Sequence, residues 1–280
     1  MPKEKAYAKI NLFLNVVNKR FDGYHDLEMV MASVNLFDVL SFKARKDQVI
    51  TVSSDKPITD DMKENLVYQV ASHLQQLFDV KMGADIHIKK NIPIAGGLAG
   101  GSADAAATLR GLNKLWKLNL SLDELAKIGL EFGSDIPFCI YNKLCIAKGR
   151  GEELAFLDNK LNFPVLIVNP HIRISTKDVF SRVREENLKE HKIAQMAAGI
   201  YNRNLAIVAQ ELHNSLEEIV FEMEPTIKDI KTQMVDWGMD GALMSGSGST
   251  VFGISQDKNA IKNVMQIMNE NYFVTLTKIR

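Results

Sequence analysis

The clearest chemical signal in the sequence is a glycine-rich segment at residues 96–102. It reads Gly-Gly-Leu-Ala-Gly-Gly-Ser and precedes a run with helical spacing of apolar residues. Glycine lets the backbone approach a ligand closely, and the first N–H groups of a helix favour a phosphate. The segment therefore predicts a phosphate-binding loop, and an ordinary turn capped by Ser102 is the alternative. Its spacing matches neither the Walker A pattern nor G-x-G-x-x-G, so a dinucleotide fold has no direct support.

Two charged residues are candidates for acid–base chemistry. Lys9 falls in the middle of an alternating segment at residues 5–17, where a strand rarely carries lysine. It either belongs to a solvated face or is held rigidly toward a cleft. Asp135 precedes Ile136 and Pro137. It either caps a helix that begins near the proline, or accepts a proton from a substrate hydroxyl during phosphoryl transfer.

Two further motifs suggest ligand contacts. Tyr24 and His25 follow the turn at Asp22-Gly23. An aromatic pair there could stack a flat ring and hydrogen-bond its edge, or could simply pack the loop. A second glycine turn at residues 246–249 lies between two apolar segments, and a plain hairpin is its alternative. The other histidines lack ligand spacing, so no structural metal is expected.

The elements that must position these residues follow from apolar periodicity. Residues 5–17 predict a half-buried strand with Lys9 and Asn11 on its polar face, and Ser121 with Glu124 predicts a capping box. The predicted strands are residues 5–17, 27–42, 84–89, 163–169, 241–245, 250–254 and 272–279, and the predicted helices are residues 64–78, 103–116, 121–133, 226–237 and 259–269. This mixture, with hairpin-like neighbours, favours an α+β fold over a doubly wound sheet.

Composition excludes several classes of protein. The 280 residues carry 34 Lys+Arg and 34 Asp+Glu, and this balance gives no global basic field for nucleic acid. Cys139 and Cys145 form neither a disulfide framework nor a zinc pattern, and we expect both to be reduced and near the core.

We expect no transmembrane helix, no signal peptide and a cytoplasmic location. The length suggests one large domain or two moderate ones, and from the order of the elements we expect a domain boundary near residues 155–162.

Taken in order, the motifs resemble those of the galactokinase, homoserine kinase, mevalonate kinase and phosphomevalonate kinase (GHMP) family. Three signatures occur in the family's order: residues 8–11 near the start, residues 93–103 in the middle and residues 245–248 near the end. A narrower resemblance, to members that phosphorylate a cytidine diphosphate, rests on residues 8–12, 22–25, 96–102, 133–138 and 149–152. These motifs span nearly the whole chain.

The resemblance implies a two-domain α+β fold with the active site in the cleft between the domains. The N-terminal ATP-binding domain, residues 1–155, would be like domain 2 of ribosomal protein S5, and the C-terminal domain, residues 156–280, would be ferredoxin-like. It further implies ATP-dependent phosphorylation of the C2 hydroxyl of 4-diphosphocytidyl-2-C-methyl-D-erythritol, in the non-mevalonate route to isoprenoid precursors. Mg²⁺ is expected with ATP. The partner is this small molecule, without nucleic acid or membrane, and the chain would be a monomer or a weak homodimer.

The resemblance also assigns roles to residues. Asp135 would be the catalytic base, and Lys9 would keep it ionised and stabilise the alkoxide. Tyr24 and Phe180 would sandwich the cytosine while His25 reads its edge. The expected ATP-binding residues are Asn65, Leu66, Pro93, Ile94, Ala95, Gly96, Gly97, Leu98, Ala99, Gly100, Gly101, Ser102 and Ala103, with Ser102 also the candidate Mg²⁺ ligand. The expected substrate-binding residues are Asn11, Tyr24, His25, Thr176, Phe180, Gly246, Ser247 and Gly248.

Three positions depart from the family pattern, and none removes a reacting group. Tyr7 stands where proline is usual, Ala103 replaces a frequent second serine, and Ser249 stands where proline or alanine is usual. Two other functions stay open at this point: a GHMP kinase for a small alcohol of the homoserine or mevalonate type, and a non-catalytic sensor that binds ATP. A nucleobase clamp at Tyr24, His25 and Phe180 argues against the first, and retention of Lys9 with Asp135 argues against the second.

Overall fold

The chain forms two compact units, and neither is one continuous stretch of sequence. The computed structural model describes residues 2–59, 61–157, 161–184, 186, 188 and 191–280. The first unit comprises Met1–Ala8, Leu36–Ile94 and Ala99–Asn142, and the second unit comprises Lys9–Asn35, Ala95–Leu98 and Lys143–Arg280. The division of the sequence into domains at residues 155 and 156 stays a prediction.

Two long strands, β1 (Lys3–Lys19) and β2 (His25–Arg45), contribute residues to both units. In hydrogen-bonding order the strands run β3-β4-β2-β1-β8, and β5 pairs with β2. The expectation of a half-buried β1 is wrong, because residues 8–16 are buried on both faces. Lys9 and Asn11 are therefore interior polar residues, which must be hydrogen-bonded to be stable there.

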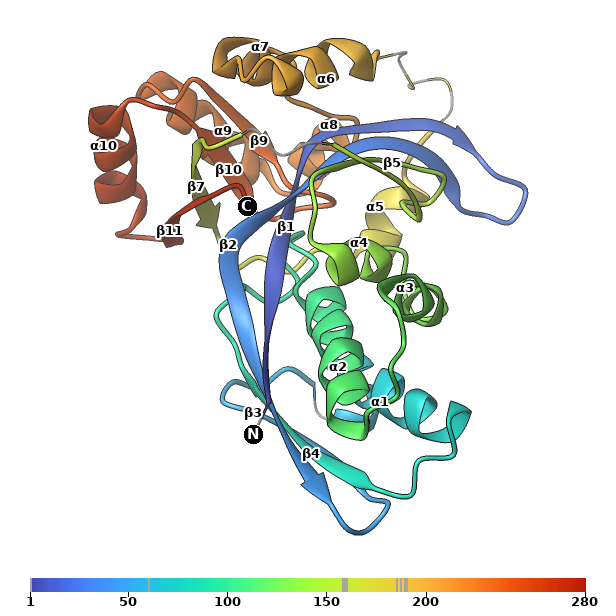
Figure 1. Ribbon diagram of the computed structural model, residues 1–280. Helices are drawn as coiled ribbons and strands as arrows, with labels where there is room; N and C mark the ends of the chain where they lie inside the picture. Colours follow the sequence, from blue (N-terminus) through green and yellow to red (C-terminus); the bar gives the residue numbers. More distant parts are fainter. Residues whose placement is uncertain (1, 60, 158–160, 185, 187, 189–190) are drawn as a thin grey trace. The chain divides into compact units, whose positions relative to one another are not determined.

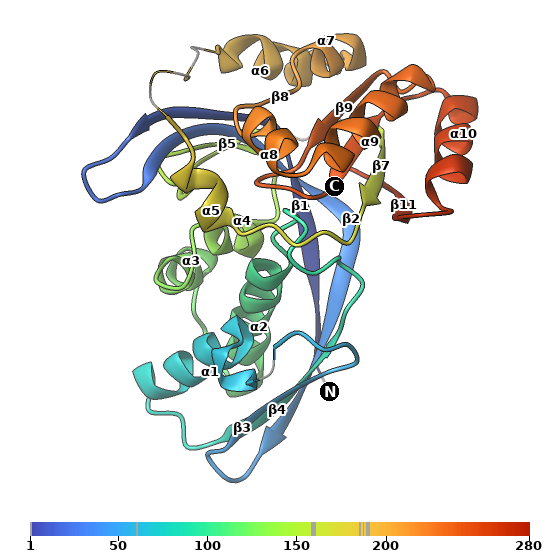
Figure 2. The same ribbon diagram turned by 180° about the vertical axis from the view of Figure 1, so that it is seen from behind.

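The first unit places helices on one side of a small sheet (Figures 1 and 2). Strand β4 (Gly83–Lys89) pairs antiparallel with the second half of β2 and parallel with β3 (Ile50–Ser54). The remaining elements are the short helix η1 (Met62–Glu64), α1 (Leu66–Leu77), α2 (Gly100–Trp116), α3 (Leu122–Leu130) and α4 (Ile136–Tyr141). The predicted capping box at Ser121 and Glu124 is confirmed at the start of α3.

Helix α2 lies very close to β2, and a glycine makes this possible. A Cβ on Gly111 would stand 2.3 Å from Cε2 of the Phe42 ring, well inside van der Waals contact. The ring of Phe42 is fully buried in this contact, together with apolar residues of α1 and α2 such as Leu74 and Leu109. Close packing of this kind holds the middle of α2 against β2.

The second unit contains an antiparallel four-stranded sheet in the order β11-β7-β10-β9. Its strands are β7 (Pro164–Asn169), β9 (Gly241–Met244), β10 (Val251–Ile254) and β11 (Phe273–Lys278). Helices α9 (Pro225–Asp236) and α10 (Lys258–Met268) connect β7 to β9 and β10 to β11 respectively, and both contact the sheet. Numbered along the chain, the strand order is 4-1-3-2, the ferredoxin-like arrangement expected for the C-terminal part.

The remaining elements of the second unit accompany the second half of β1 and the first half of β2. Strand β5 (Cys145–Lys148) pairs with β2 and with β6 (Glu153–Phe156), and β8 (His213–Asn214) pairs with β1. The helices here are α5 (Thr176–Ser181), α6 (Ile193–Tyr201), α7 (Leu205–Gln210) and α8 (Glu217–Met223).

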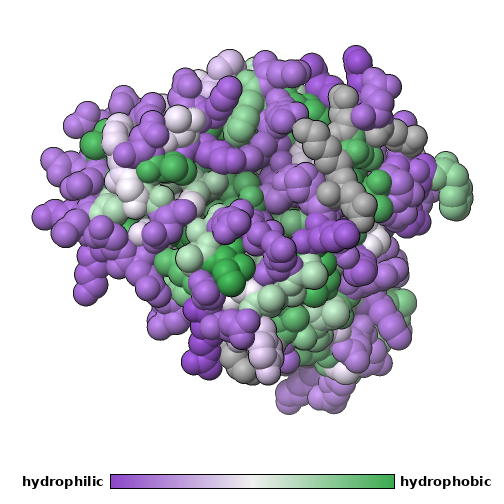
Figure 3. All heavy atoms as spheres, turned by 90° about the horizontal axis from the view of Figure 1, so that it is seen from above, coloured by the Kyte–Doolittle hydropathy of each residue, from purple (hydrophilic) through white to green (hydrophobic). Residues whose placement is uncertain are grey.

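The polar surface and the buried cysteines match what the composition suggested. Hydrophilic side chains cover most of the face in Figure 3, and apolar residues lie among them in separate groups. Within the described chain, no helix has both the length and the apolar character needed to cross a bilayer. Cys139 and Cys145 are buried and reduced, as predicted. Burial raises the pKa of the Cys145 thiol to about 12, so it has little thiolate character.

Candidate active site

The backbone of the glycine-rich segment alternates in a way that suits an anion. Ala95, Gly97 and Ala99 have positive φ angles of 55°, 74° and 53°, while the residues between them do not. Such alternation turns successive N–H groups toward one point and forms an anion-binding concavity. Two of these three positions are alanines, which pay a steric cost for this conformation, so packing must hold it in place.

Helix α2 starts at the end of this segment, at Gly100. Its N-cap is Ala99, which makes no side-chain capping bond, so the interpretation of Ser102 as the N-cap is wrong. Ser102 lies within the first turn instead, because the left-handed backbone of Ala99 begins the helix earlier. The unpaired N–H groups and the positive dipole end of α2 add to the attraction for a phosphate.

The first half of the segment, Ala95–Leu98, is fixed to the turn between β9 and β10. Thr250 donates its backbone N–H to the carbonyl oxygen of Gly96 at 3.2 Å, and the Ser245 hydroxyl donates to the carbonyl oxygen of Gly97 at 3.0 Å. A Cβ on Gly97 would stand 2.2 Å from the Ser245 carbonyl oxygen. Only glycine fits at residue 97, both for its φ angle and for this contact.

Lys9 lies beside the same turn. Its backbone N–H donates to the carbonyl oxygen of Leu98 at 3.1 Å, and its ammonium donates to Oδ1 of Asn11 at 2.7 Å. The Lys9 Nζ is 3.4 Å from the position that a Cβ on Gly246 would take. With only 5% of its surface exposed, Lys9 does not lie on a solvated face, and the alternative weighed for it is wrong.

The predicted nucleobase-binding residues occur together in the second unit. The rings of His25 and Phe180 are 5.3 Å apart, and the guanidinium of Arg150 lies 4.5 Å from the centre of the Tyr24 ring. The His25 side chain is buried, with 7% of its surface exposed. The sandwich of a cytosine between Tyr24 and Phe180 stays a prediction.

Thr176 and Ser247 connect α5 to the second glycine turn. Their hydroxyl oxygens are 2.8 Å apart, so the predicted substrate-binding residues at 176 and 246–248 are neighbours. Asn214 supports the same turn by donating from its side-chain amide to the carbonyl oxygens of Met244 and Gly246, both at 2.8 Å. The turn is therefore more than a plain hairpin, because its carbonyls are held from outside.

The first unit holds the predicted adenine contacts. Asn65 is the N-cap of α1, where its Oδ1 accepts from the Val67 N–H at 2.9 Å. The Leu66 Cδ1 lies 3.8 Å from the position that a Cβ on Gly101 would take. The start of α1 and the start of α2 are thus adjacent. Pro93 and Ile94 precede the segment, and Ala103 is buried in α2.

Asp135 occupies the N-cap position of α4, with Pro137 just inside the helix. The predicted helix start at Asp135 and Pro137 is confirmed, although the Asp135 side chain makes no capping hydrogen bond. Its role as a base stays a prediction. Asp135 belongs to the first unit and Lys9 to the second, and their pairing stays a prediction.

Sequence reasoning missed two groups of residues. Asp38, Lys90 and Asp104 form a buried ionic cluster in the first unit, at the two ends of the glycine-rich segment. A charged residue inside an apolar strand, as at Asp38, was the signal available for it. Arg150 was noted only as part of a family motif, although its position over Tyr24 gives it a direct contact with a predicted binding residue.

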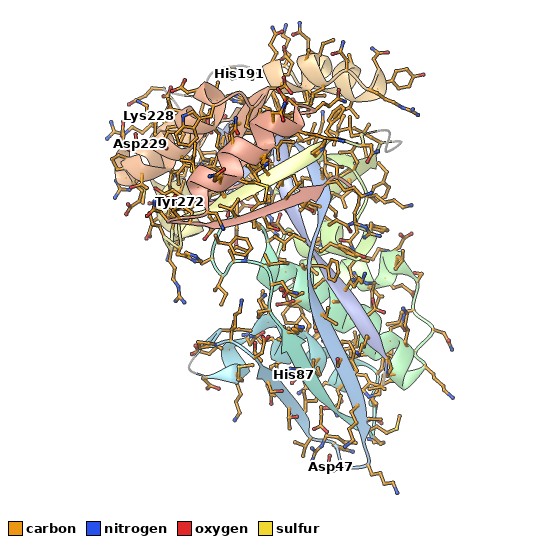
Figure 4. The ribbon with its side chains drawn as sticks, turned by 90° about the vertical axis from the view of Figure 1, so that its left-hand side faces the viewer. Asp47, His87, His191, Lys228, Asp229 and Tyr272 are labelled. Atoms are coloured by element: carbon orange, nitrogen blue, oxygen red, sulfur yellow. The ribbon has the colours of Figure 1, made fainter. Side chains whose placement is uncertain are left out.

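Several histidines contact other side chains of the protein. His87, labelled on β4 in Figure 4, shares a 3.0 Å hydrogen bond with the Ser53 hydroxyl. His191 stacks on His213 with 3.7 Å between the ring centres. Among the residues that the structure describes, no group of three or more His, Cys, Asp or Glu side chains could hold a metal ion. Burial, followed by the nearby charges of His191 and Lys231, lowers the pKa of His213 to about 4.

Comparison with known proteins gives consistent matches over the whole chain. Residues 65–143 match the family model for the GHMP kinases N-terminal domain, and residues 196–274 match that for the GHMP kinases C-terminal domain. A 4-diphosphocytidyl-2-C-methyl-D-erythritol kinase of Bacillus cytotoxicus is 45% identical over 251 residues, which cover 89% of this chain and 86% of the relative.

Solved structures agree. A crystal structure of 4-(cytidine 5'-diphospho)-2C-methyl-D-erythritol kinase superposes with a TM-score of 0.85 at 28% identity, and 99% of each chain is covered. A homoserine kinase from Cytophaga hutchinsonii has a TM-score of 0.75 at 18% identity, covering 100% of this chain and 95% of the other. The second likeness shows the fold alone.

Proposed function

Because the chain belongs to the GHMP kinase family, we propose that it transfers the γ-phosphoryl group of ATP to the C2 hydroxyl of 4-diphosphocytidyl-2-C-methyl-D-erythritol. The observation that carries this proposal is the 45% identity to a kinase of that name over 86% of the relative's length. ATP is the co-substrate of the family. The homoserine kinase type matches only at the level of the fold, and no observation favours it.

The geometry of each unit supports separate parts of this reaction. The alternating backbone at residues 95–99 and the start of α2 supply N–H groups for the phosphates of ATP. The start of α1, with Asn65 and Leu66, lies next to the start of α2 and would form one wall of the adenine pocket. His25 and Phe180, whose rings are in contact, and Tyr24, which precedes His25, offer aromatic faces on which a cytosine can stack.

In the proposed reaction, Asp135 accepts the proton of the C2 hydroxyl while that oxygen forms a bond to the γ-phosphorus. The bond between the γ-phosphorus and the bridging oxygen breaks, and ADP leaves. Lys9, held by Asn11, would stabilise the negative charge on the attacking oxygen and on the transferred group. The role of Lys9 agrees with its buried position in β1.

Mg²⁺ would neutralise charge on the phosphates when it binds together with ATP. Magnesium normally keeps several waters and uses few protein ligands beside the phosphates. Ser102 fits that use, since it offers one hydroxyl in the first turn of α2, beside the N–H groups proposed to bind phosphate. We further propose a cytoplasmic monomer or weak homodimer that binds no nucleic acid, in keeping with its balanced charge.

A substrate panel tests the function directly. The protein is incubated with ATP, Mg²⁺ and one acceptor at a time, and ADP release is followed by a coupled assay. We expect turnover with 4-diphosphocytidyl-2-C-methyl-D-erythritol and background rates with homoserine, with mevalonate or without acceptor. Preference for mevalonate or homoserine would contradict the substrate assignment. Absence of ADP release with every acceptor, while ATP still binds, would favour the non-catalytic sensor.

A further inference from the structure

A buried cluster of three charged side chains joins the chain before the glycine-rich segment to the helix after it. The Lys90 ammonium donates to Oδ2 of Asp38 at 2.5 Å and to Oδ2 of Asp104 at 2.7 Å. Lys90 directly follows β4, and Asp104 lies in α2. All three side chains are at most 4% exposed. One ammonium therefore bridges the two ends of the segment from within the first unit.

Asp38 extends this bridge to the backbone. Its second oxygen, Oδ1, accepts the N–H groups of Asn91 and Ile92 at 2.5 and 2.8 Å. The side-chain amide of Asn91 donates in turn to the carbonyl oxygen of Phe37 at 2.8 Å. Residues 91 and 92, which lead into the segment, are thus fixed by a carboxylate that also holds Lys90.

The ammonium lies close to the start of α2. The Lys90 Nζ is 3.5 Å from the position that a Cβ on Gly100 would take, and Ile92 contacts the same position at 3.2 Å. Gly100 is the first residue of α2, where the N–H groups proposed to bind phosphate begin. The cluster and the proposed ATP site thus share the same backbone.

Stability alone is a poor explanation for this cluster. Burying three charges costs several kcal/mol each, and an apolar set of the same shape is often as stable or more stable. Oδ1 of Asp104 is buried and has no hydrogen-bond partner, so the cluster is not even fully satisfied. What charged partners do supply is a penalty against other arrangements, because separating a buried charge from its partner is strongly destabilising.

We propose that Asp38, Lys90 and Asp104 are positioning residues that set the start of α2 and the approach to the glycine-rich segment for ATP binding. This inference rests on the proposed function, since it assumes that the segment binds the phosphates of ATP. It assigns a task to three residues that sequence analysis did not place among the ATP or substrate contacts.

Asp104→Leu separates positioning from stability. Leucine has a similar shape and leaves Lys90 paired with Asp38, so the fold should remain as stable as the wild type or gain stability. We expect its Kd for a non-hydrolysable ATP analogue with Mg²⁺ to rise about tenfold or more, because small displacements of binding groups have large effects. Its Kd for CDP, the probe of the substrate site, should stay unchanged. Asp104→Asn keeps an acceptor for Lys90 and should lose less ATP affinity than Asp104→Leu.

Glu4 provides the matched control. It pairs with Arg110 and Lys114 in the same unit and its side chain is 11% exposed, yet it lies in a different part of that unit's sequence from the glycine-rich segment. Glu4→Leu and Glu4→Gln should leave both Kd values at the wild-type level. Calorimetry measures binding, and urea denaturation measures the free energy of unfolding of each variant.

The outcomes are distinguishable. ATP-analogue affinity within twofold of wild type in folded Asp104→Leu overturns the proposal, as does an equal loss for the analogue and CDP. If Asp104→Leu does not fold, unchanged analogue affinity in Asp104→Asn overturns it as well. Analogue binding needs no acceptor, so a wild type that binds it but never phosphorylates an acceptor contradicts the proposed function alone. A wild type that binds no analogue contradicts both.

Discussion

The two halves of the glycine-rich segment are held by different chemistry. Ala95–Leu98 belongs to the second unit and is fixed by neutral hydrogen bonds and by a contact that only Gly97 permits. The stretch from Ala99 belongs to the first unit, where Asp38, Lys90 and Asp104 hold the start of α2 with charges. The first arrangement depends on shape and the second on electrostatics. Substitutions in the two halves should therefore differ in their effects on stability, on its pH dependence and on activity.

The largest expected loss of stability comes from a substitution in the charged half. Lys90→Met leaves two buried carboxylates without their cation, which typically costs about 3–5 kcal/mol. Urea denaturation should show this loss in the free energy of unfolding. Lys114→Met is the control, because Lys114 is 66% exposed and its ion pair with Glu4 should contribute less than about 1 kcal/mol. Equal losses in the two variants would show that burial of the cluster has no special consequence.

Alanine substitutions at one glycine in each half allow a direct comparison of the two halves. Gly97→Ala puts a Cβ 2.2 Å from the Ser245 carbonyl oxygen at a φ of 74°, and should cost about 2–3 kcal/mol of stability and most of the kinase activity. Gly101→Ala meets only Leu66 at 3.8 Å and lies in a helix, where alanine is favoured by up to about 1 kcal/mol. Unfolding curves and steady-state rates measure both. A Gly101→Ala variant as impaired as Gly97→Ala would break the comparison.

The contribution of the charged half to the free energy of unfolding should depend on pH, whereas that of the neutral half should not. Burial, with a smaller contribution from Asp38 and against the effect of Lys90, raises the pKa of Asp104 to about 7. The unfolded value is about 3.9, so the folded state binds the extra proton between these values. The stability that this proton supplies is complete below pH ~4 and is lost as the pH rises through 7.

Asp104→Asn should remove this contribution. Its free energy of unfolding, relative to wild type, should increase with pH by up to about 1.4 kcal/mol per unit between pH 5 and 7. Denaturation at three pH values without nucleotide measures the slope. Parallel pH profiles for the two proteins would mean that Asp104 is ionised throughout.

The smallest effect is expected in the neutral half. Ser245→Ala removes the hydroxyl that donates to the Gly97 carbonyl, a neutral hydrogen bond that typically contributes about 1 kcal/mol. The free energy of unfolding should fall by that amount without a change in its pH dependence. A loss as large as that of Lys90→Met would show that the first half also depends on more than shape.

The sequence allowed much of this site to be predicted, and the reasons for the rest are physical. Gly97, Asp135 and the capping box at Ser121 are local signals, because turn and cap chemistry acts between neighbouring residues. Lys9 was expected in its strand, but its burial depends on what covers both faces of β1, and strand periodicity does not contain that information.

The charged cluster could not be predicted for a similar reason. Lys90 is 52 residues from Asp38 and 14 from Asp104, and only the tertiary fold brings the three together. Asp104 alone reads as a polar interruption in an alanine-rich helix. Ser102 was misjudged because the left-handed backbone at Ala99, which no propensity favours for alanine, starts the helix early.

The most direct test of the central claim is a single-turnover measurement with Asp135→Asn. The protein is mixed with ATP, Mg²⁺ and 4-diphosphocytidyl-2-C-methyl-D-erythritol, and formation of the phosphorylated product is followed with time. Loss of a general base should slow the transfer by about 100- to 10,000-fold, while the Kd for an ATP analogue stays at the wild-type value. Transfer at a rate near that of the wild type would contradict the assignment of Asp135 and the mechanism built on it.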